Sequence, residues 1–289
     1  MPSSEKNKIN KFLARIFFVL VLINSCLFAL EVKPEKMDVK QGGVYKFIVS
    51  LDDKDEFKSA KYNGRELAYF NQSNKEFIVI LGINLIDKPG SATVEIESMN
   101  SSKSLLLNII EGKYPRRDMT LAKKHSVFTE EQIEIINTDS AIMQSIFNKH
   151  NSKRHFEGSF LKPVPGVINC PFGENRYING EKRSPHSGID LKGKTGTKVK
   201  ATNNGTVVLA GTHFLSGNSI IIDHGMSIYS MYFHLSKIKV SIGDYVKKGQ
   251  IIGLVGSTGR STGSHLHYGI RANYAKIDPK MLWEMEIKK

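Results

Sequence analysis

The sequence predicts a mainly β protein: a small N-terminal β-sandwich, a linker with one helix, and a C-terminal antiparallel all-β domain. Three observations predict this class. Short apolar runs alternate with turn-forming stretches in residues 31–112, helical periodicity occurs near 130–150, and residues 160–289 are dense in glycine and β-branched residues. A chain of 289 residues has room for two modest domains. The predicted segments are 1–30, 31–112, 113–159 and 160–289.

Residues 1–30 have the pattern of a secretory signal. Basic side chains precede the apolar run IFFVLVLI (16–23), and small residues follow it. A spanning helix needs about 20 apolar residues, and the polar pair at 24–25 interrupts this run early. We therefore expect export to the periplasm or cell envelope. Cleavage after Ala29, lipidation at Cys26 and retention as an inner-membrane anchor are alternatives that the sequence leaves open.

Cysteine usage and charge narrow the expected class of protein and of partner further. If the signal is cleaved, Cys170 is the only cysteine left, so no intrachain disulfide can form. The formal net charge of +13 is uneven: residues 31–112 carry 11 basic and 13 acidic side chains, whereas 166–289 carry 17 and 8. The basic C-terminal half suits an anionic polymer or membrane surface. Nucleic acid is not an expected partner of an exported chain.

The N-terminal region predicts a β-sandwich with no catalytic residues. Its strand-like runs are VYKFIVSL, KEFIVIL, SATVEIES and SLLLNII, separated by turn-like stretches such as KYNGREL and DKPGS. Several short strands at regular spacing are typical of this fold.

The middle of the chain predicts a linker followed by one amphipathic helix near 130–150. EGKYPRRD (111–118) breaks the strand pattern, and Thr129 with Gln132 forms a capping pair. The apolar positions at near-helical spacing are Ile133, Ile136, Met143, Ile146 and Phe147. We expect this helix to pack on a neighbouring domain, with a lid as the alternative.

Residues 160–289 predict antiparallel strands joined by tight turns. Runs such as TKVKATNNGTVVLAG, NSIIIDHG and IIGLVGSTG combine glycine with β-branched residues. Asn204–Gly205 predicts a two-residue hairpin.

Histidines gather in this β domain. His265 and His267 are two residues apart, so on a strand both side chains face one site. SPHSGIDL supplies His186 and Asp190, both good zinc ligands, and YFHL adds His234 on another strand. By contrast, we expect structural roles for His213 at a strand end and for His224 in a turn.

These five polar residues predict a zinc site in which the roles are divided. A catalytic zinc keeps three protein ligands and an open position for water, so two of the five candidates must act in another way. The residue types alone leave open which histidine has which role.

HSGID together with GSTGRSTGSHLHYGI resembles the lysostaphin/LytM-type zinc metalloendopeptidases, which are peptidoglycan hydrolases. PFGENR, GTKVKATNNGTVVLAG, YSMYFHL and VKKGQIIGLVG agree with that family in order and spacing. The resemblance covers roughly residues 165–280. An exported chain with an added N-terminal domain is similar to the Gram-negative periplasmic multidomain type.

The resemblance implies specific roles. Its zinc ligands would be His186, Asp190 and His267, and His265 and His234 would act on the water and the tetrahedral intermediate. Tyr177 would be a further donor toward the substrate. Arg176 matches an arginine of the family's FG-R pattern with two extra residues after Gly173, and a structural role suits it equally well.

The resemblance also implies a function. The family cuts peptide cross-links or stem peptides of peptidoglycan, so we expect a zinc-dependent D,D-endopeptidase, with D,D-carboxypeptidase activity in some relatives, acting in wall remodelling and cell shape. The main alternative is a non-enzymatic regulator of other wall hydrolases, against which the five intact polar residues argue. A biotinyl/lipoyl-like carrier lacks its lysine hairpin here, and a zinc-dependent wall-binding module would have no open metal position.

Overall fold

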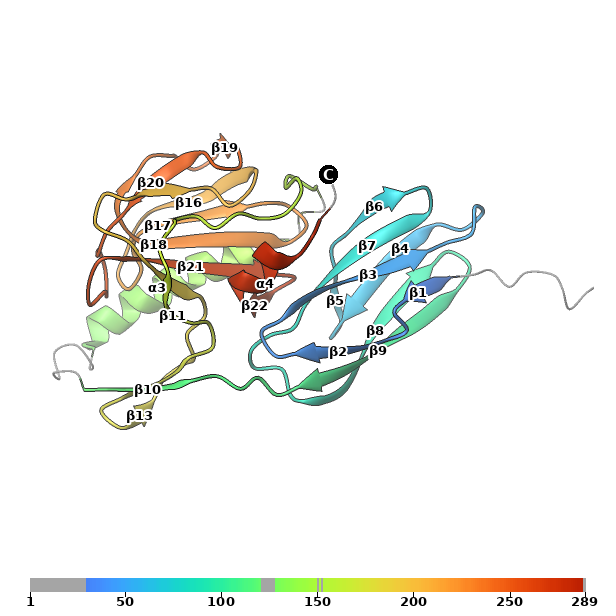
Figure 1. Cartoon of the computed structure of the whole chain (residues 1–289), viewed down its shortest axis with the longest axis horizontal. Helices are drawn as coiled ribbons and strands as arrows, with labels where there is room; N and C mark the ends of the chain where they lie inside the picture. The colour runs from blue at the N-terminus through green and yellow to red at the C-terminus, as the bar shows by residue number, and fades with distance from the viewer. Residues whose placement is uncertain (1–29, 121–127, 150, 152, 288–289) are drawn as a thin grey trace, which may run out of the picture.

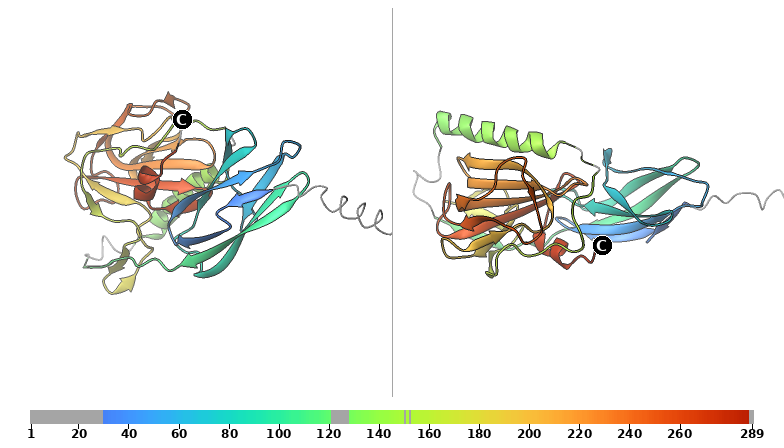
Figure 2. Two further views of the ribbon diagram at one scale, coloured as in Figure 1. Left: turned by 45° about the vertical axis from the view of Figure 1, so that its right-hand side comes forward. Right: turned by 90° about the horizontal axis from the view of Figure 1, so that it is seen from above.

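The computed structural model of the chain describes residues 30–120, 128–149, 151 and 153–287. The predicted mainly β class is confirmed: two bodies built from strands lie side by side, and one long helix lies along the C-terminal body (Figures 1 and 2). Apart from Leu30, the predicted signal segment lies outside the described residues. None of the helices in the described ranges is long and apolar enough to cross a membrane.

The N-terminal body consists of two sheets. One has the order β1 (Glu31–Lys33), β3 (Val44–Ser50), β7 (Glu76–Gly82), β6 (Tyr69–Ser73). The other has the order β2 (Lys36–Lys40), β9 (Ser102–Ile110), β8 (Gly90–Ser98), β4 (Phe57–Tyr62), β5 (Arg65–Glu66). Only the β2–β9 pair among these is parallel.

Alternation along these strands produces one shared core. In β9, Leu105, Leu107 and Ile109 are buried while the residues between them are exposed. They join Phe47 and Val79 of the opposite sheet in a single apolar cluster. Each such side chain contributes roughly 1.5–3 kcal/mol when fully buried.

The C-terminal body is one ten-stranded sheet. Its main path is β11 (Ile168–Cys170), β14 (Ile189–Lys192), β21 (His265–Ala272), β18 (Ile228–Ile238), β17 (Gly217–Asp223), β16 (Gly205–His213), β19 (Tyr245–Val246). The remaining strands are β15 (Lys198–Lys200), β20 (Ile251–Val255) and β22 (Ala275–Ile277), and the short helix α4 (Pro279–Glu284) follows.

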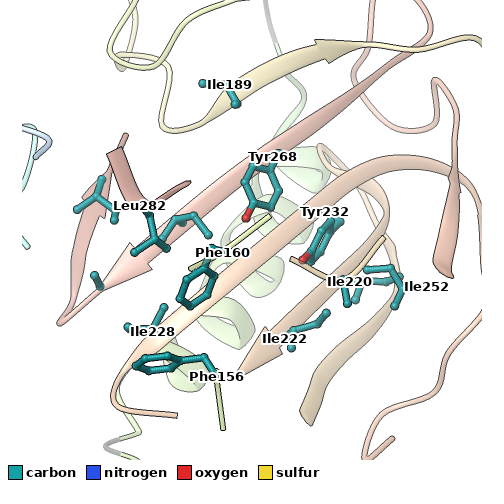
Figure 3. Packing of buried hydrophobic residues seen from close by; sticks show 14 of the residues in the cluster. Phe156, Phe160, Ile189, Ile220, Ile222, Ile228, Tyr232, Ile252, Tyr268 and Leu282 are labelled. Carbon is teal, nitrogen blue, oxygen red and sulfur yellow. The ribbon is translucent and has the colours of Figure 1, made fainter. Parts of the chain in front are cut away.

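One face of this sheet packs on the large core. Tyr232 and Tyr268 lie in that core without solvent contact, next to Ile220 and Phe160 (Figure 3). Because side chains alternate along a strand, burying Tyr268 toward this core places its neighbour His267 on the opposite face.

Helix α3 (Glu130–Phe147) covers part of that opposite face (Figure 2). The predicted capping box is confirmed: Gln132 N donates to Thr129 Oγ1 at 3.2 Å, and Thr129 N donates to Gln132 Oε1 at 3.1 Å. At the C-terminal end of the helix, Phe147 packs edge-on against Tyr229, with ring centroids 5.4 Å apart. The apolar cluster there also contains Leu209, Ile221 and Met231.

The region predicted as linker contains a strand. β10 (Arg116–Met119) pairs in parallel with β12 (Asn175–Ile178), which in turn pairs with β13 (Glu181–Lys182). The pairing of Arg117 with Arg176 joins positions 59 residues apart in the chain. The segment between the two domains is thereby fixed close to residues 171–190.

The predicted Asn204–Gly205 hairpin is wrong. Strands β15 and β16, which flank this pair, do not pair with each other. Asn204 instead accepts hydrogen bonds from His224 Nδ1 and from Lys248 N. The two-residue hairpin lies between β21 and β22, where Asn273 and Tyr274 have φ of 47° and 70°, the positive values that a type I′ turn requires.

This hairpin joins the two domains. Asn273 is buried; its Oδ1 accepts a hydrogen bond from Ala68 N at 3.0 Å, and its Nδ2 donates to the Ile80 carbonyl. The side chains of Ala68 and Ile80 belong to the same apolar cluster as Tyr268 of the C-terminal sheet. The core of the C-terminal domain therefore extends across the domain boundary.

Candidate metal centre and active site

Strands β14 and β21 place three of the predicted polar residues on one sheet face. Their register pairs Asp190 with His267 and Lys192 with His265. Residues two apart on a strand share a face, so Asp190 and His267 are cross-strand neighbours and His265 lies one step further along. His186, in the loop before β14, completes the group.

Three donor atoms converge at this point. His186 Nε2 lies 2.9 Å from His267 Nδ1 and 3.1 Å from Asp190 Oδ1, and the last two atoms are 2.9 Å apart. Zinc binds imidazole nitrogen and carboxylate oxygen at about 2.0–2.2 Å in a tetrahedral arrangement, which brings its ligand atoms within about 3.5 Å of one another. Two imidazoles and one carboxylate at these separations fit a zinc ion with a fourth position left for water.

Further contacts hold each donor in place. His186 Nδ1 donates to the Pro171 carbonyl at 3.0 Å, which leaves Nε2 without a proton and free for a metal. The Phe233 ring is stacked on His267, with centroids 5.5 Å and planes 9° apart. Gly188 is required by close approach, because a Cβ there would lie 2.5 Å from the Tyr268 carbonyl and 2.9 Å from His267 Nε2.

The electrostatics suit a metal site at neutral pH. Burial would raise the pKa of Asp190, but the close approach of the His186 and His267 rings to its carboxylate outweighs burial and holds that pKa well below its usual range. Burial lowers the pKa of His267 to about 4. The carboxylate is therefore charged and the imidazole neutral, which are the forms that bind zinc.

A second set of possible ligands shares His186 and Asp190 with the first. Cys170, His186 and Asp190 also offer ligand atoms within 4.8 Å of one another. The Cys170 sulfur, however, faces His186 Nδ1 at 3.2 Å, on the side of the ring away from His267. Burial is the main cause that raises the pKa of the Cys170 thiol to about 12, and its hydrogen bond to the Glu174 carboxylate is the second. A neutral thiol is not the form that binds zinc, so this sulfur supports the His186 ring instead.

His234 and His265 lie beside these donors as a pair. Their ring centroids are 4.9 Å apart, and His265 Nε2 is 3.7 Å from Asp190 Oδ1. His265 Nδ1 donates to the Gly263 carbonyl at 2.7 Å, and His234 Nδ1 donates to the Thr258 carbonyl at 2.8 Å. Since a carbonyl only accepts, Nδ1 holds a proton in each ring, and Nε2 is the atom that can exchange one with a substrate.

The backbone of His234 has a strained conformation that orients its side chain toward His265. Its φ is 63°, uncommon for a non-glycine residue, and its N–H donates to the Ser216 carbonyl. The β17–β18 register shifts between Asn218 and Ile220, so the strand is irregular next to His234. Burial also lowers the pKa of His234, which keeps the ring neutral.

The structure brings five of the six predicted site residues together. Tyr177 is the exception: it lies in β12, where the Arg116 guanidinium is 3.8 Å from its ring centroid. Within the described part of the chain, no hydrogen bond or ring contact joins Tyr177 to the five. A role for it toward the substrate stays a prediction.

A buried ionic network behind the metal site was not predicted. Glu174 is 3% exposed and bridges two arginines: Arg117 Nε lies 3.0 Å from its Oε2, and Arg176 Nε lies 3.5 Å from its Oε1. Arg176 Nη2 also donates to Asp190 Oδ2 at 3.2 Å. The FG-R resemblance pointed to Arg176, but the part played by Arg117 depends on the parallel β10–β12 pairing, for which the sequence has no signal.

Comparison with known proteins finds a peptidase family in the same part of the chain. The sequence model of a protein family, "Peptidase family M23", matches residues 184–279 of this chain. The peptidoglycan DD-endopeptidase ShyA of Vibrio cholerae is 47% identical over 102 residues, which are 35% of this chain and 24% of ShyA. Lysostaphin of Staphylococcus simulans is 44% identical over 99 residues, which are 34% of this chain and 20% of lysostaphin. The aligned part of the chain thus spans a quarter or less of either relative.

One solved structure resembles nearly the whole chain. A protein from Pseudomonas aeruginosa, assigned to peptidase M23, superposes with a TM-score of 0.69 at 28% identity, covering 84% of this chain and 94% of that one. Residues 184–279 make up only a third of the present chain. The likeness therefore includes the N-terminal domain as well as the metal centre.

Proposed function

This chain belongs to peptidase family M23 through its residues 184–279, and we propose that it is a zinc-dependent peptidoglycan endopeptidase that hydrolyses peptide cross-links. One observation carries the proposal: three zinc-type donor atoms lie within 3.1 Å of one another, next to two histidines with free Nε2 atoms. A metal that only stabilised the fold would need no such pair.

The proposed mechanism divides the work among five side chains. His186, Asp190 and His267 would hold the zinc ion, which when bound polarises the scissile carbonyl and lowers the pKa of its water toward ~7. Nε2 of His265 or of His234 accepts the proton of the attacking water. That ring then carries an Nε2–H, which donates a hydrogen bond to the carbonyl oxygen as negative charge develops there and afterwards passes its proton to the leaving amine.

The peptidoglycan substrate is proposed on two grounds. Aligned relatives are named a peptidoglycan DD-endopeptidase and lysostaphin, and the basic C-terminal half of the chain suits a polymer that carries carboxylates. Trimming of terminal D-alanine, a role in cell shape, and export to the periplasm with or without membrane attachment are further parts of the proposal.

Digestion of purified sacculi tests the proposal. The purified protein is incubated with zinc or with chelator, and the released muropeptides are identified by mass spectrometry. We expect chelator-sensitive conversion of cross-linked dimers to monomers, with loss of terminal alanine from pentapeptides if carboxypeptidase activity is present. His265→Ala, which leaves all three proposed ligands in place, serves as the matched inactive control.

The alternative function gives a different result in the same experiment. A non-enzymatic regulator would leave the sacculi unchanged with or without zinc, and would accelerate digestion by an added wall amidase. Unchanged sacculi at full zinc occupancy would therefore refute the endopeptidase.

A further inference from the structure

A pocket of about 550 Å³ lies directly beside His265. Its polar lining consists of Asn169, Lys192, Lys194, Thr262, Ser264 and His265. We propose that this pocket binds a free carboxylate of the wall peptide whose adjacent amide bond is cleaved. The inference rests on the proposed function and names the feature of the substrate that the site recognises.

Strand register places the pocket next to the reacting groups. Lys192 pairs with His265 across β14 and β21, and it is two residues from Asp190 on the same strand. Lys192 therefore belongs to the face that carries the metal donors, about 6.6–6.8 Å along it. A peptide lying across the metal centre brings the group next to its scissile bond to this point.

The pocket has positive charge that its own surroundings leave unbalanced. Lys192 and Lys194 are both exposed. Across residues 30–120, 128–149, 151 and 153–287, neither ammonium group forms a salt bridge with a carboxylate. Two lysines beside amide and hydroxyl groups form a donor-rich surface, which a carboxylate complements.

The walls of the pocket are tied to each other. Ser264 Oγ donates to the Gly193 carbonyl at 2.9 Å, and Thr195 Oγ1 donates to Ser264 Oγ at 3.1 Å. These bonds connect the loop after β14 to the loop before β21, one on each side of the pocket. The lysines are thus presented from a braced surface, which reduces the entropy lost on binding.

Continuity with the metal centre favours a carboxylate of the substrate itself. A free anion would bind wherever lysines gather, for example at Lys237 and Lys239, which are also exposed but do not line this pocket. His265 instead belongs both to the lining of this pocket and to the proposed reaction site, so the two form one continuous groove. Stem peptides of peptidoglycan carry free carboxylates along their length, so such a groove meets them at each cross-link.

The test compares two substrates in the full protein. One is a cross-linked muropeptide dimer with its free carboxylates, and the other is the same dimer with those groups converted to methylamides. For the wild type we expect KM about tenfold higher with the amidated dimer, the size of one charge-assisted hydrogen bond at an exposed site. The double variant Lys192→Gln/Lys194→Gln should raise KM for the free-acid dimer about tenfold and leave the amidated dimer unchanged.

A matched variant and a zinc measurement exclude indirect effects. Lys237→Gln/Lys239→Gln removes the same charge elsewhere and should retain the preference for the free acid. Zinc content and kcat should stay within about twofold of wild type in both variants. Equal KM changes for the two dimers, or none in the Lys192→Gln/Lys194→Gln protein, would overturn the proposal.

Binding separates this inference from the proposed function. If the wild type cleaves neither dimer, the endopeptidase proposal fails, and titration calorimetry of the metal-stripped protein with each dimer still tests the pocket. Tighter binding of the free-acid dimer, abolished by the lysine substitutions, would support the carboxylate site. Equal binding of the two dimers would refute it.

Discussion

The two ends of one sheet face differ in what covers them. Strands β18 and β21 run through both ends. At one end Tyr229 and Met231 are buried under Phe147 of helix α3. At the other, His265 and His267 keep 16% and 13% of their side-chain surface exposed, beside the pocket with its two lysines.

This difference shows how the chain obtains a rigid site. Alternation puts both sets of side chains on the same face, so the strands themselves do not distinguish core from active site. The C-terminal end of helix α3 makes the distinction, because Phe147 packs on the apolar end. The histidines then project from a sheet whose other face is packed on the large core, and residues on strands are held more firmly than residues on loops.

The largest expected effect separates two kinds of residue at the polar end. Asp190→Ala should lose bound zinc as well as cleavage of sacculi, because it removes one of three ligands. His265→Ala should keep its zinc while turnover falls by roughly 10² or more. Zinc content by mass spectrometry and muropeptide release measure the two properties separately.

These two variants can also contradict the assignment. An Asp190→Ala protein with full zinc would remove that residue from the ligand set. Wild-type turnover in His265→Ala would remove that histidine from the mechanism.

The next effect concerns the covered end. Phe147→Ala should lower the free energy of unfolding by about 3 kcal/mol, because it empties a buried aromatic site. Arg271, whose guanidinium carbon lies 4.2 Å from the Phe147 ring centroid, would lose that contact too. Urea unfolding measures the change, and Ile142→Ala, at a position 44% exposed on the same helix, is the control with an expected loss under about 1 kcal/mol.

If Phe147→Ala also lowered kcat of the folded protein, the two ends would not be independent. Unchanged kcat at temperatures where the variant is folded is the expected result, since Phe147 contacts none of the proposed ligands.

A smaller effect is expected from the buried ionic network behind the metal centre, at the polar end of the sheet face. Glu174→Gln keeps the size of the side chain but weakens its ion pairs with Arg117 and Arg176. Because Arg176 donates a hydrogen bond to Asp190, the position of Asp190 is then less fixed. We expect zinc affinity to fall about tenfold, the lower range for residues that orient metal ligands. Competition with a fluorescent zinc chelator measures it.

Glu181→Gln provides the control for this substitution. Its carboxylate is 72% exposed and pairs with Arg183 at the surface. Equal zinc affinities for the two glutamine variants would show that the buried network does not position Asp190.

The smallest effect lies in the core on the other side of the sheet. Burial lowers the pKa of His224 to about 4, against about 6.5 in an unfolded chain. Between these values the unfolded chain binds more protons than the folded one, so the free energy of unfolding falls as the pH falls. From pH 6 to pH 5 this residue alone accounts for about 1 kcal/mol.

Urea titrations of metal-stripped protein at both pH values measure this loss. In His224→Gln the loss should be smaller than in the wild type by that amount, although the variant is less stable overall because the hydrogen bonds to Asn204 and Ser230 change. Identical pH dependence in the two proteins would contradict the assignment.

Part of the site was predictable because it depends on local geometry. The period of two along a strand is sufficient to place His265 and His267 on one face, and the capping pair Thr129–Gln132 marks the start of α3. The run YFHL made His234 a candidate, but its role could be assigned only through the resemblance, since its orientation depends on a positive φ and an irregular strand.

The rest depends on long-range pairing. Arg117 reaches Glu174 because two short strands pair in parallel, and nothing in EGKYPRRD indicates a strand. Asn204–Gly205 has the composition of a tight hairpin, but tertiary hydrogen bonds give Asn204 another role, whereas Asn273–Tyr274 forms the turn with a less typical sequence. At each of these positions the long-range contacts of the fold override the local conformational preference of the sequence.

The buried Asn273 has a thermodynamic consequence for the whole chain. Its amide satisfies backbone groups of the N-terminal domain, and the shared core would be opened if either domain came away. The two domains should therefore melt in a single cooperative transition, with equal calorimetric and van't Hoff enthalpies. Strand β21, which carries both His265 and His267, ends at this junction, so this shared melting temperature sets the upper limit for keeping the metal centre intact.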